Sequence, residues 1–470
     1  MSIFMTKIYG DSFTPDWVAD STFYQIFPDR FFNGDASNDP PGVEPWGNPP
    51  TRENFFGGDL RGILRKTGYL QDLGINTLYL NPIFKAKTNH KYDTVDYFEI
   101  DPAFGSNELF REFVDDLHNR GMRIILDGVF NHCGDGFKAF VDFKNQGEKS
   151  PYSDWFIPIS YPIREDPPSY YTCGGASDLP KFNIENPEVQ NYILKVAAHW
   201  LKHASIDGWR LDCPSKIPLG FWRKFREVVK EVNPQAYLVG EIWRDAEPWI
   251  QGGIFDGVTN YRLRELILGF CSSGILDAED FAYEVGHLLD CLGAAAPSML
   301  NLLGCHDTSR VLTVFNGEVK RLLIAIVFQM TTIGAPMIYY GDEVGMLGDT
   351  DPDCRRTMVW DENLWNRLIL QTYKQLIQLR MAHQALRRGR LLTLLTVGKV
   401  YAYKREYEDD EIIVLLNPGI AAHNMTITIN SKVEKWRDVF RGKEIAASNG
   451  SLLFENIGAF SFVVLTPIQK

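Results

Sequence analysis

The chain has 470 residues, 45% of them hydrophobic and 23% charged, which is enough apolar material for an ordinary globular core. Its 60 acidic and 48 basic side chains give a formal net charge of -12, which argues against nucleic-acid binding and against long-range steering of anionic substrates. The seven cysteines contain no CxxC pair, so neither a zinc site nor a disulfide framework is indicated. Without a signal-peptide pattern or a bilayer-length apolar run, we expect no membrane association and a cytoplasmic location.

Helix and strand patterns alternate along the first 340 residues. The expected strands are residues 23–27, 77–80, 123–129, 208–211, 237–240, 255–260, 300–303 and 337–340. The helices expected between them include residues 60–73, 107–120, 187–203, 221–232 and 320–332, with Asn107 as the N-cap of the second. This α/β alternation predicts a (β/α)8 TIM barrel rather than an open doubly wound sheet. Dinucleotide-binding and phosphate-loop motifs are absent from the sequence.

Two segments depart from this alternation. Residues 133–183 are rich in Pro, Tyr, Trp and Asp without a helical period, which predicts an inserted domain after the third strand. From residue 387, short β-rich runs separated by turns predict a C-terminal antiparallel β-sandwich. The expected domains are therefore a barrel of residues 1–132 and 184–386, an insertion of 133–183, and a sandwich of 387–470. We expect the sandwich to pack against the barrel rather than to bind carbohydrate.

Four short polar segments follow strand-like runs, at residues 127–132, 208–212, 240–243 and 306–307. In a TIM barrel the carboxyl ends of the strands meet at one face, where the active site is built. The segments supply several carboxylates, two histidines and an arginine, which suits acid/base and nucleophilic chemistry on a sugar acetal. Cys213 and Cys305 lie beside these segments, and we interpret both as small packing thiols.

The four segments resemble the conserved regions of the alpha-amylase family of glycoside hydrolases. Leu179-Pro-Lys-Phe-Asn183 resembles a fifth region, in the form typical of the neopullulanase, cyclomaltodextrinase and maltogenic amylase branch. Residues 23–31, 89–94 and 338–343 fit the same branch. The resemblance covers nearly the whole chain and implies a retaining glycoside hydrolase.

The resemblance implies a role for each acid. Asp212 matches the nucleophile, Glu241 the general acid/base, and Asp307 the third acid, which grips the distorted sugar. Arg210 lies two residues before Asp212 on one strand, so both side chains should face the barrel interior. We expect this fixed cation to lower the pKa of Asp212.

Other residues match substrate contacts of the branch. They include two histidines that bind the sugar at the cleavage point, an aromatic platform with a neighbouring histidine, and an aromatic side chain on the acceptor side. In that order these are His132, His306, Tyr92, His90 and Trp243. Asp127 and Asn131 match structural positions. Lys216 stands where relatives often carry an acid on the leaving-group side, and we hypothesise that it alters the balance between hydrolysis and transfer.

An oxygen-rich loop predicts a structural calcium ion. Its candidate ligands are Asn33, Asp35, Asn38, Asp39, Gly57 and Asp59. Hard oxygen donors at loop spacing suit Ca²⁺ rather than zinc. The alternative from the residues alone is an Asx-rich turn, and the resemblance favours calcium.

Members of the branch usually carry a β-domain before the barrel, whereas the first strand here is expected near residue 23. We therefore expect a monomer, or a dimer not formed through such a domain. The expected activity is hydrolysis of α-1,4 bonds in cyclodextrins, pullulan and malto-oligosaccharides, with some α-1,6 cleavage and transglycosylation. The alternatives are a debranching enzyme or α-glucosidase of the same family and, more remotely, a non-catalytic partner subunit.

Overall fold

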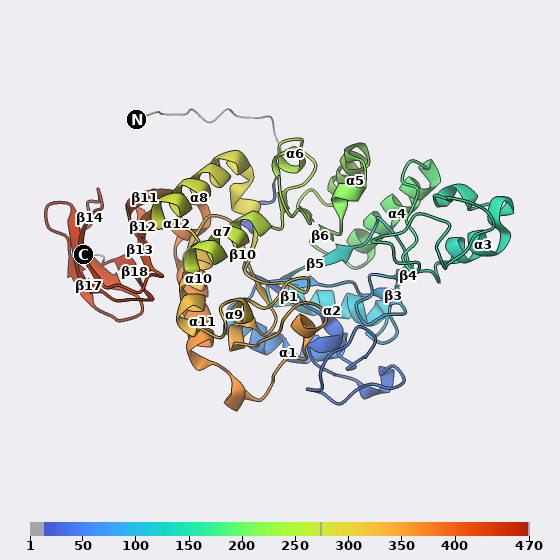
Figure 1. Cartoon of the computed structure of the whole chain (residues 1–470), viewed down its shortest axis with the longest axis horizontal. Helices are drawn as coiled ribbons and strands as arrows, with labels where there is room; N and C mark the ends of the chain where they lie inside the picture. Colours follow the sequence, from blue (N-terminus) through green and yellow to red (C-terminus); the bar gives the residue numbers. More distant parts are fainter. Residues whose placement is uncertain (1–13, 273–274, 469–470) are drawn as a thin grey trace.

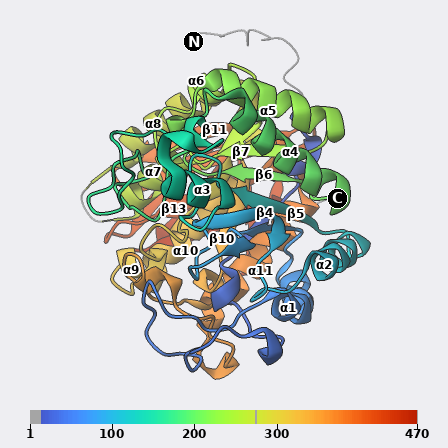
Figure 2. The same ribbon diagram turned by 90° about the vertical axis from the view of Figure 1, so that its right-hand side faces the viewer.

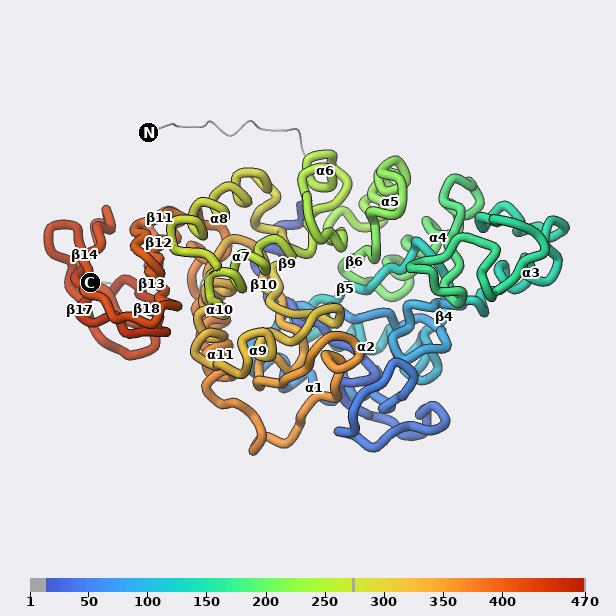
Figure 3. Tube along the Cα trace, in the orientation of Figure 1, coloured from blue at the N-terminus to red at the C-terminus, as the bar shows by residue number. Residues whose placement is uncertain are grey.

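The computed structural model describes residues 14–272 and 275–468. Three regions follow one another along its long axis (Figure 1): C-terminal sheets at one end, a barrel in the middle, and an excursion around helix α3 (Lys138–Gln146) at the other. The tube in Figure 3 shows the same order. Seen from the side of the excursion, α3 lies in front of the barrel strands (Figure 2).

Eight parallel strands form the barrel, in the order β8-β7-β6-β5-β2-β1-β10-β9. Their bounds are β1 Phe23–Ile26, β2 Thr77–Leu80, β5 Arg123–Gly128, β6 Gly208–Leu211, β7 Tyr237–Gly240, β8 Gly257–Val258, β9 Leu300–Leu302 and β10 Ala335–Tyr339. A parallel bridge between Thr259 and Leu300 joins the two ends of this sheet. The predicted TIM barrel is therefore confirmed.

Helices of the described residues lie around the barrel and in the excursion (Figure 1). They are α1 Leu60–Leu73, α2 Asn107–Asn119, α3 Lys138–Gln146, α4 Pro187–His203, α5 Leu219–Val232, α6 Glu247–Ile250, α7 Tyr261–Cys271, α8 Ala278–Leu292, α9 Val311–Val314, α10 Val319–Thr331, α11 Arg367–Ala382 and α12 Gln384–Arg388. The N-cap of α2 is Ser106, whose hydroxyl accepts from Leu109 N, so the assignment of Asn107 was wrong. Asn107 instead bonds to the backbone of Ile100 and Phe98, which ties α2 to β4 (Thr94–Ile100).

The excursion after β5 contains a helix that its sequence pattern did not indicate. Helix α3 has nine residues, about two and a half turns, which is too short for a clear helical period. It buries Phe140 and Phe143 against Phe156. A short hairpin, formed by β3 (Phe84–Ala86) and β4, follows β2 and reaches the same region as this excursion.

The C-terminal region contains two antiparallel sheets. One has the order β11-β12-β13-β18-β15-β16, and the other pairs β14 with β17. Their bounds are β11 Arg390–Val397, β12 Val400–Tyr407, β13 Asp410–Asn417, β14 His423–Thr428, β15 Lys435–Asp438, β16 Glu444–Ala446, β17 Ser451–Ile457 and β18 Ser461–Pro467. Val400, Ile413, Ile427 and Leu452 belong to the core shared by these strands.

The other face of the larger sheet packs on the barrel helices. Tyr401 and Tyr403 of β12 share a core with Phe281 and Phe328 of α8 and α10. The Tyr403 hydroxyl lies 2.6 Å from Thr331 Oγ1. This contact agrees with a domain that covers the side of the barrel. Among the described residues, no helix is long and apolar enough to cross a membrane.

Candidate active site

The polar segments at the ends of the barrel strands line one cavity of about 450 Å³. Its walls are Arg52, His90, Tyr92, His132, Cys173, Leu179, Asp212, Cys213, Glu241, Trp243, Asp307, Asp351 and Arg355. Asp212 and Glu241 directly follow β6 and β7, while Leu179 comes from the excursion after β5. A larger cavity of about 670 Å³ beside Trp46 contains none of the three predicted catalytic acids.

Arg210 holds three carboxylates together on the cavity floor. Its Nη1 lies 2.9 Å from Asp127 Oδ1 and 3.1 Å from Asp212 Oδ1. Its Nη2 lies 3.1 Å from Glu241 Oε1. All four side chains are buried. Asp127 also accepts hydrogen bonds from Tyr79 Oη and Tyr92 Oη, at 2.6 and 2.8 Å, which agrees with a structural role.

The pKa of Asp212 is raised well above its usual value, mainly by burial and then by the carboxylate of Glu241. Arg210 acts in the expected, lowering direction, but burial and Glu241 outweigh it. Carboxylate oxygens of Asp212 and Glu241 lie within 4.8 Å of each other. Two acids this close do not both ionise readily, which favours one neutral and one charged carboxyl group.

Glu241 is positioned by two donors besides Arg210. The backbone N–H of Cys213 donates to Glu241 Oε2 at 3.0 Å, and Trp243 Nε1 donates to Oε1 at 3.2 Å. Cys213 has a φ of 43°, in the left-handed region that non-glycine residues seldom adopt. Trp243 stacks on Tyr261 with the ring centroids 3.8 Å apart, yet 46% of its surface is exposed. A half-exposed, held indole can stack on a sugar face.

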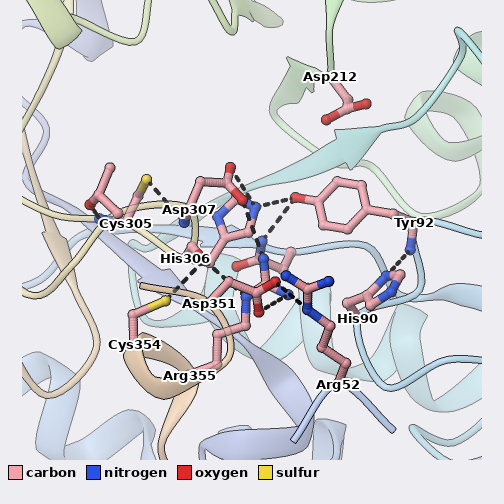
Figure 4. Close-up of polar contacts among 12 residues, drawn as sticks. Arg52, His90, Tyr92, Asp212, Cys305, His306, Asp307, Asp351, Cys354 and Arg355 are labelled. Atoms are coloured by element: carbon pink, nitrogen blue, oxygen red, sulfur yellow. Dashed lines mark hydrogen bonds and ion pairs between the residues drawn. The ribbon is translucent and has the colours of Figure 1, made fainter. Parts of the chain in front are cut away.

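Asp307 lies beside His306 and apart from Asp212 (Figure 4). Its Oδ1 is 3.3 Å from Arg355 Nη2, and its Oδ2 is 3.1 Å from His306 Nε2. Arg355 also pairs with Asp351 at 2.9 Å, and Asp351 pairs with Arg52 at 3.3 Å. Asp307 is thus held by charge contacts on one side of the cavity.

Three histidines contact Tyr92. His306 is stacked nearly parallel to Tyr92 with 7° between the planes, and its Nε2 lies 2.6 Å from Tyr92 Oη. Gln25 Nε2 lies 2.8 Å from His306 Nδ1, so Nδ1 accepts and Nε2 carries the proton. Burial lowers the pKa of His306 well below its usual value, and it lowers that of His90 to about 4. His132 Nε2 bonds to the carbonyl oxygen of Tyr92 at 3.1 Å.

Lys216 lies apart from the other predicted site residues. It ends a short 3-10 turn, Pro214–Lys216, and its side chain is exposed and not part of the cavity wall. Its effect on the acceptor side stays a prediction.

The sequence reasoning missed Arg52, Cys173, Asp351 and Arg355, which all line the cavity. They lie in loops after β1, β5 and β10, outside any strand-end motif. Loop residues follow no helical or strand period, so nothing in the sequence indicated that these four line the site. Only folding brings their loops to one face of the barrel.

The oxygen-rich loop gathers most of the predicted calcium ligands. Asn33 Nδ2 donates to Asp39 Oδ1 at 2.7 Å, and a Cβ at Gly57 would lie 2.4 Å from that same oxygen. Asn38 Oδ1 is buried without a hydrogen-bond donor among the described residues. Asp59 is buried, and its carboxylate caps α1 by accepting from Gly62 N at 2.6 Å. Its other oxygen accepts from the N–H groups of Gly34 and Asp35. The clustered oxygens and the unpartnered carbonyl suit a hard cation.

Residues 25–366 match the family described as "Alpha amylase, catalytic domain". The chain belongs to the alpha-amylase family of glycoside hydrolases. Residues 392–464 match the C-terminal domain of maltogenic amylase. The barrel match shows that this chain is an enzyme of the alpha-amylase family. The C-terminal match agrees with the expected branch.

Named relatives support this assignment. A cyclomaltodextrinase of Thermoanaerobacter pseudethanolicus is 48% identical over 445 residues, which cover 94% of this chain and 77% of that protein. Neopullulanase 2 of Thermoactinomyces vulgaris is 43% identical, covering 93% of this chain and 76% of that protein. The solved structure of cyclic alpha-maltosyl-(1→6)-maltose hydrolase from Arthrobacter globiformis has a TM-score of 0.89 at 41% identity. That match covers 97% of this chain and 100% of the hydrolase.

Proposed function

We propose that this enzyme hydrolyses α-1,4-glucosidic bonds with retention of configuration, using Asp212 as nucleophile and Glu241 as general acid/base. The observation that carries the proposal is the pair of carboxyl groups held by Arg210 at the cavity floor, with oxygens within 4.8 Å. Retaining glycosidases place their two carboxyl groups about 5–5.5 Å apart, whereas inverting enzymes need about 6.5–9.5 Å.

In the first step, Glu241 protonates the glycosidic oxygen while Asp212 attacks the anomeric carbon. The bond to the leaving sugar breaks, and a covalent glycosyl ester forms on Asp212. The close approach of the two carboxyl groups supports this division of labour, because two like charges this near each other favour one neutral acid and one carboxylate. The contact with Arg210 stabilises the carboxylate that attacks.

In the second step, Glu241 acts as base and takes a proton from water or from a sugar hydroxyl. The resulting oxygen nucleophile attacks the anomeric carbon and releases Asp212. Asp307 and His306, whose Oδ2 and Nε2 atoms lie 3.1 Å apart, would hold the hydroxyls of the distorted sugar. Water gives hydrolysis, and a sugar gives transglycosylation.

The proposed substrates are cyclodextrins, pullulan and malto-oligosaccharides. The relatives' names, cyclomaltodextrinase and neopullulanase, support this class. The neutral histidines and the exposed Trp243 suit an uncharged, hydroxyl-rich ligand.

A second candidate is cleavage of α-1,6 bonds, as in a debranching enzyme. It is favoured by the Arthrobacter hydrolase, whose name includes a (1→6) linkage and whose whole chain is matched by this one. The two candidates share the same chemistry and differ in which linkage the cavity accepts.

The deciding experiment compares product release from γ-cyclodextrin, pullulan, soluble starch and panose under identical conditions. We expect cyclodextrin opening to be faster than starch cleavage. Fast starch cleavage with slow cyclodextrin opening would contradict the proposal, and preferential cleavage of the α-1,6 bond of panose would favour the second candidate.

We also propose that the oxygen-rich loop holds a structural Ca²⁺ ion, bound by Asn33, Asp35, Asn38, Asp39, Gly57 and Asp59. The buried, unpartnered Asn38 Oδ1 supports this. Removing calcium with a chelator should lower the unfolding temperature while kcat stays unchanged below that temperature. Asn38→Ala should abolish this calcium-dependent shift; an equal shift in wild type and variant would contradict the assignment.

A cytoplasmic location is part of the proposal. All seven cysteines are free thiols in the structure, and two of them line the cavity, which suits a reducing compartment.

A further inference from the structure

A second cavity adjoins the catalytic cavity at Trp243. It has a volume of about 600 Å³, and Trp243 belongs to the walls of both cavities. Its other walls come from the segment after β7 and from helices α7 and α8, which lie side by side (Figure 1). The two-step mechanism proposed above uses no side chain of these helices.

One face of α8 lines this cavity. Glu284, His287, Leu288 and Cys291 all belong to its wall, and residues three, four and seven positions apart share one side of a helix. The next residue, Leu292, is buried in a hydrophobic core that α8 shares with α6. Packed side chains therefore support this wall from behind.

Arg262 of α7 bridges the cavity wall to α8. Its Nη1 lies 3.3 Å from Glu265 Oε2, and its Nη2 lies 3.3 Å from Glu284 Oε2. A guanidinium has five N–H donors, more than these two contacts use, and each carboxylate oxygen can accept further hydrogen bonds. Acidic side chains outnumber the arginines in this wall. The combination suits an uncharged ligand rich in hydroxyl groups and disfavours an anionic one.

Trp243 indicates which part of a substrate meets this cavity. Its Nε1 donates to Glu241 Oε1 at 3.2 Å, and Glu241 protonates the oxygen of the leaving sugar in the proposed mechanism. The indole thus stands between the catalytic acid and the second cavity. A volume of about 600 Å³ lies within the range of cavities that hold ligands of drug size, such as a short oligosaccharide.

We propose that the cavity between Trp243 and the helices α7 and α8 binds the leaving-group portion of a glucan substrate, with Arg262 and Glu284 as specificity-determining residues. The inference rests on the proposed function, because Glu241 defines the leaving-group side. The cavity favours substrates that extend several sugar units beyond the cleaved bond. It also receives the acceptor sugar in transglycosylation, since the acceptor takes the place of the leaving group.

Substrates with long and short leaving groups test the site by kinetics. The measured quantity is kcat/KM for maltohexaose divided by kcat/KM for 4-nitrophenyl maltoside, whose leaving group is a single ring. Arg262→Ala should lower this ratio about tenfold, the usual effect of losing a hydrogen bond to a charged group. Glu284→Gln, which keeps the size of the side chain, should lower the ratio in the same direction.

Arg111→Ala is the matched control. Like Arg262, Arg111 is a half-exposed arginine paired with a glutamate three residues away on its own helix, in this case Glu108 at 3.0 Å. It lies on α2 and lines neither cavity. This variant should keep the wild-type ratio, and unfolding temperatures establish that each variant is folded.

Binding gives a second readout that needs no turnover. Asp212→Asn enzyme is titrated with maltohexaose and with maltose by calorimetry, with and without Arg262→Ala. We expect Arg262→Ala to weaken maltohexaose binding about tenfold and maltose binding much less.

The proposal is overturned if Arg262→Ala keeps the wild-type ratio, if it weakens long and short ligands equally, or if Arg111→Ala has the same effect. Failure to hydrolyse maltohexaose, with length-dependent binding that still requires Arg262, would count against the proposed function and not against this cavity.

Discussion

Arg210 sets the chemistry of the cavity at the scale of single residues. It contacts both Asp212 and Glu241, and its burial makes these contacts strong. The two acids differ in what else they touch, since Glu241 alone accepts from Cys213 N and Trp243 Nε1. The same guanidinium therefore serves two carboxyl groups with different roles.

Replacing each acid by its amide separates these roles. Glu241→Gln should lower kcat on malto-oligosaccharides by about 10²–10⁴-fold, the usual contribution of general acid–base catalysis. With 4-nitrophenyl maltoside as substrate, the rate of the first step should fall much less in this variant, because that leaving group needs little protonation. Asp212→Asn should abolish turnover of both substrates. Retained oligosaccharide turnover in Glu241→Gln would refute the acid/base assignment.

The positive charge of Lys216 is the basis of a separate prediction. It is exposed and lies four residues after Asp212. If its charge influences the incoming acceptor, Lys216→Glu should change the ratio of transfer to hydrolysis products from maltotriose, as measured by product chromatography. Lys216→Gln, which removes the charge without reversing it, should give an intermediate ratio. An unchanged ratio in both variants would end the hypothesis.

At the scale of elements, Glu343 joins three parts of the barrel. It lies in the turn Asp342–Val344 after β10, and its Oε1 accepts from Tyr24 of β1 at 2.8 Å and from Tyr69 of α1 at 2.6 Å. Burial raises its pKa to about 7, while the two tyrosine hydrogen bonds act in the opposite direction. The folded enzyme therefore holds this proton more tightly than the unfolded chain does.

This raised pKa predicts a pH-dependent loss of stability. The contribution of Glu343 is fully present below the unfolded pKa near 4.5 and is lost as the pH rises through about 7. At 1.36 kcal/mol per pKa unit, the free energy of unfolding should fall by about 3 kcal/mol across this range. Glu343→Gln should remove this component from the pH profile measured by denaturant unfolding. Glu265→Gln, at an exposed site on α7, serves as the control and should retain it.

At the scale of the whole molecule, the C-terminal sheets and the barrel share a core. Tyr403 is fully buried between them and contacts Phe328 at a centroid distance of 5.6 Å. Arg405 reinforces the joint by donating to the carbonyl oxygens of Thr331 and Gly389, at 2.5 and 2.7 Å. We therefore expect the described chain to unfold as one cooperative unit.

Tyr403→Ala tests this unit. Truncating a large buried aromatic side chain costs about 3–5 kcal/mol, so calorimetry should show a single transition at a lower temperature. Leu453→Ala, at a 58% exposed position on β17, should change little. Two separate transitions in the wild-type enzyme would contradict the shared core.

The sequence by itself determined the barrel and the three acids. Strand-length apolar runs and helical periods are local, and they located Thr77–Leu80 and Pro187–His203 at their observed bounds. The motifs around Asp212, Glu241 and Asp307 are local too, because each acid follows its own strand. Helix α3 escaped detection because its nine residues are too few to establish a period.

Only the tertiary structure decided which distant loops complete the cavity and how its charges balance. Arg52, Cys173, Asp351 and Arg355 come from loops far apart in the chain and meet at one face because parallel strands place their carboxyl ends together. The spacing of Arg210 and Asp212 along one strand predicted the direction in which Arg210 acts on the pKa of Asp212, but not the larger, opposing effects of burial and Glu241. Local patterns specify elements and motifs, whereas burial and contacts between loops exist only after folding.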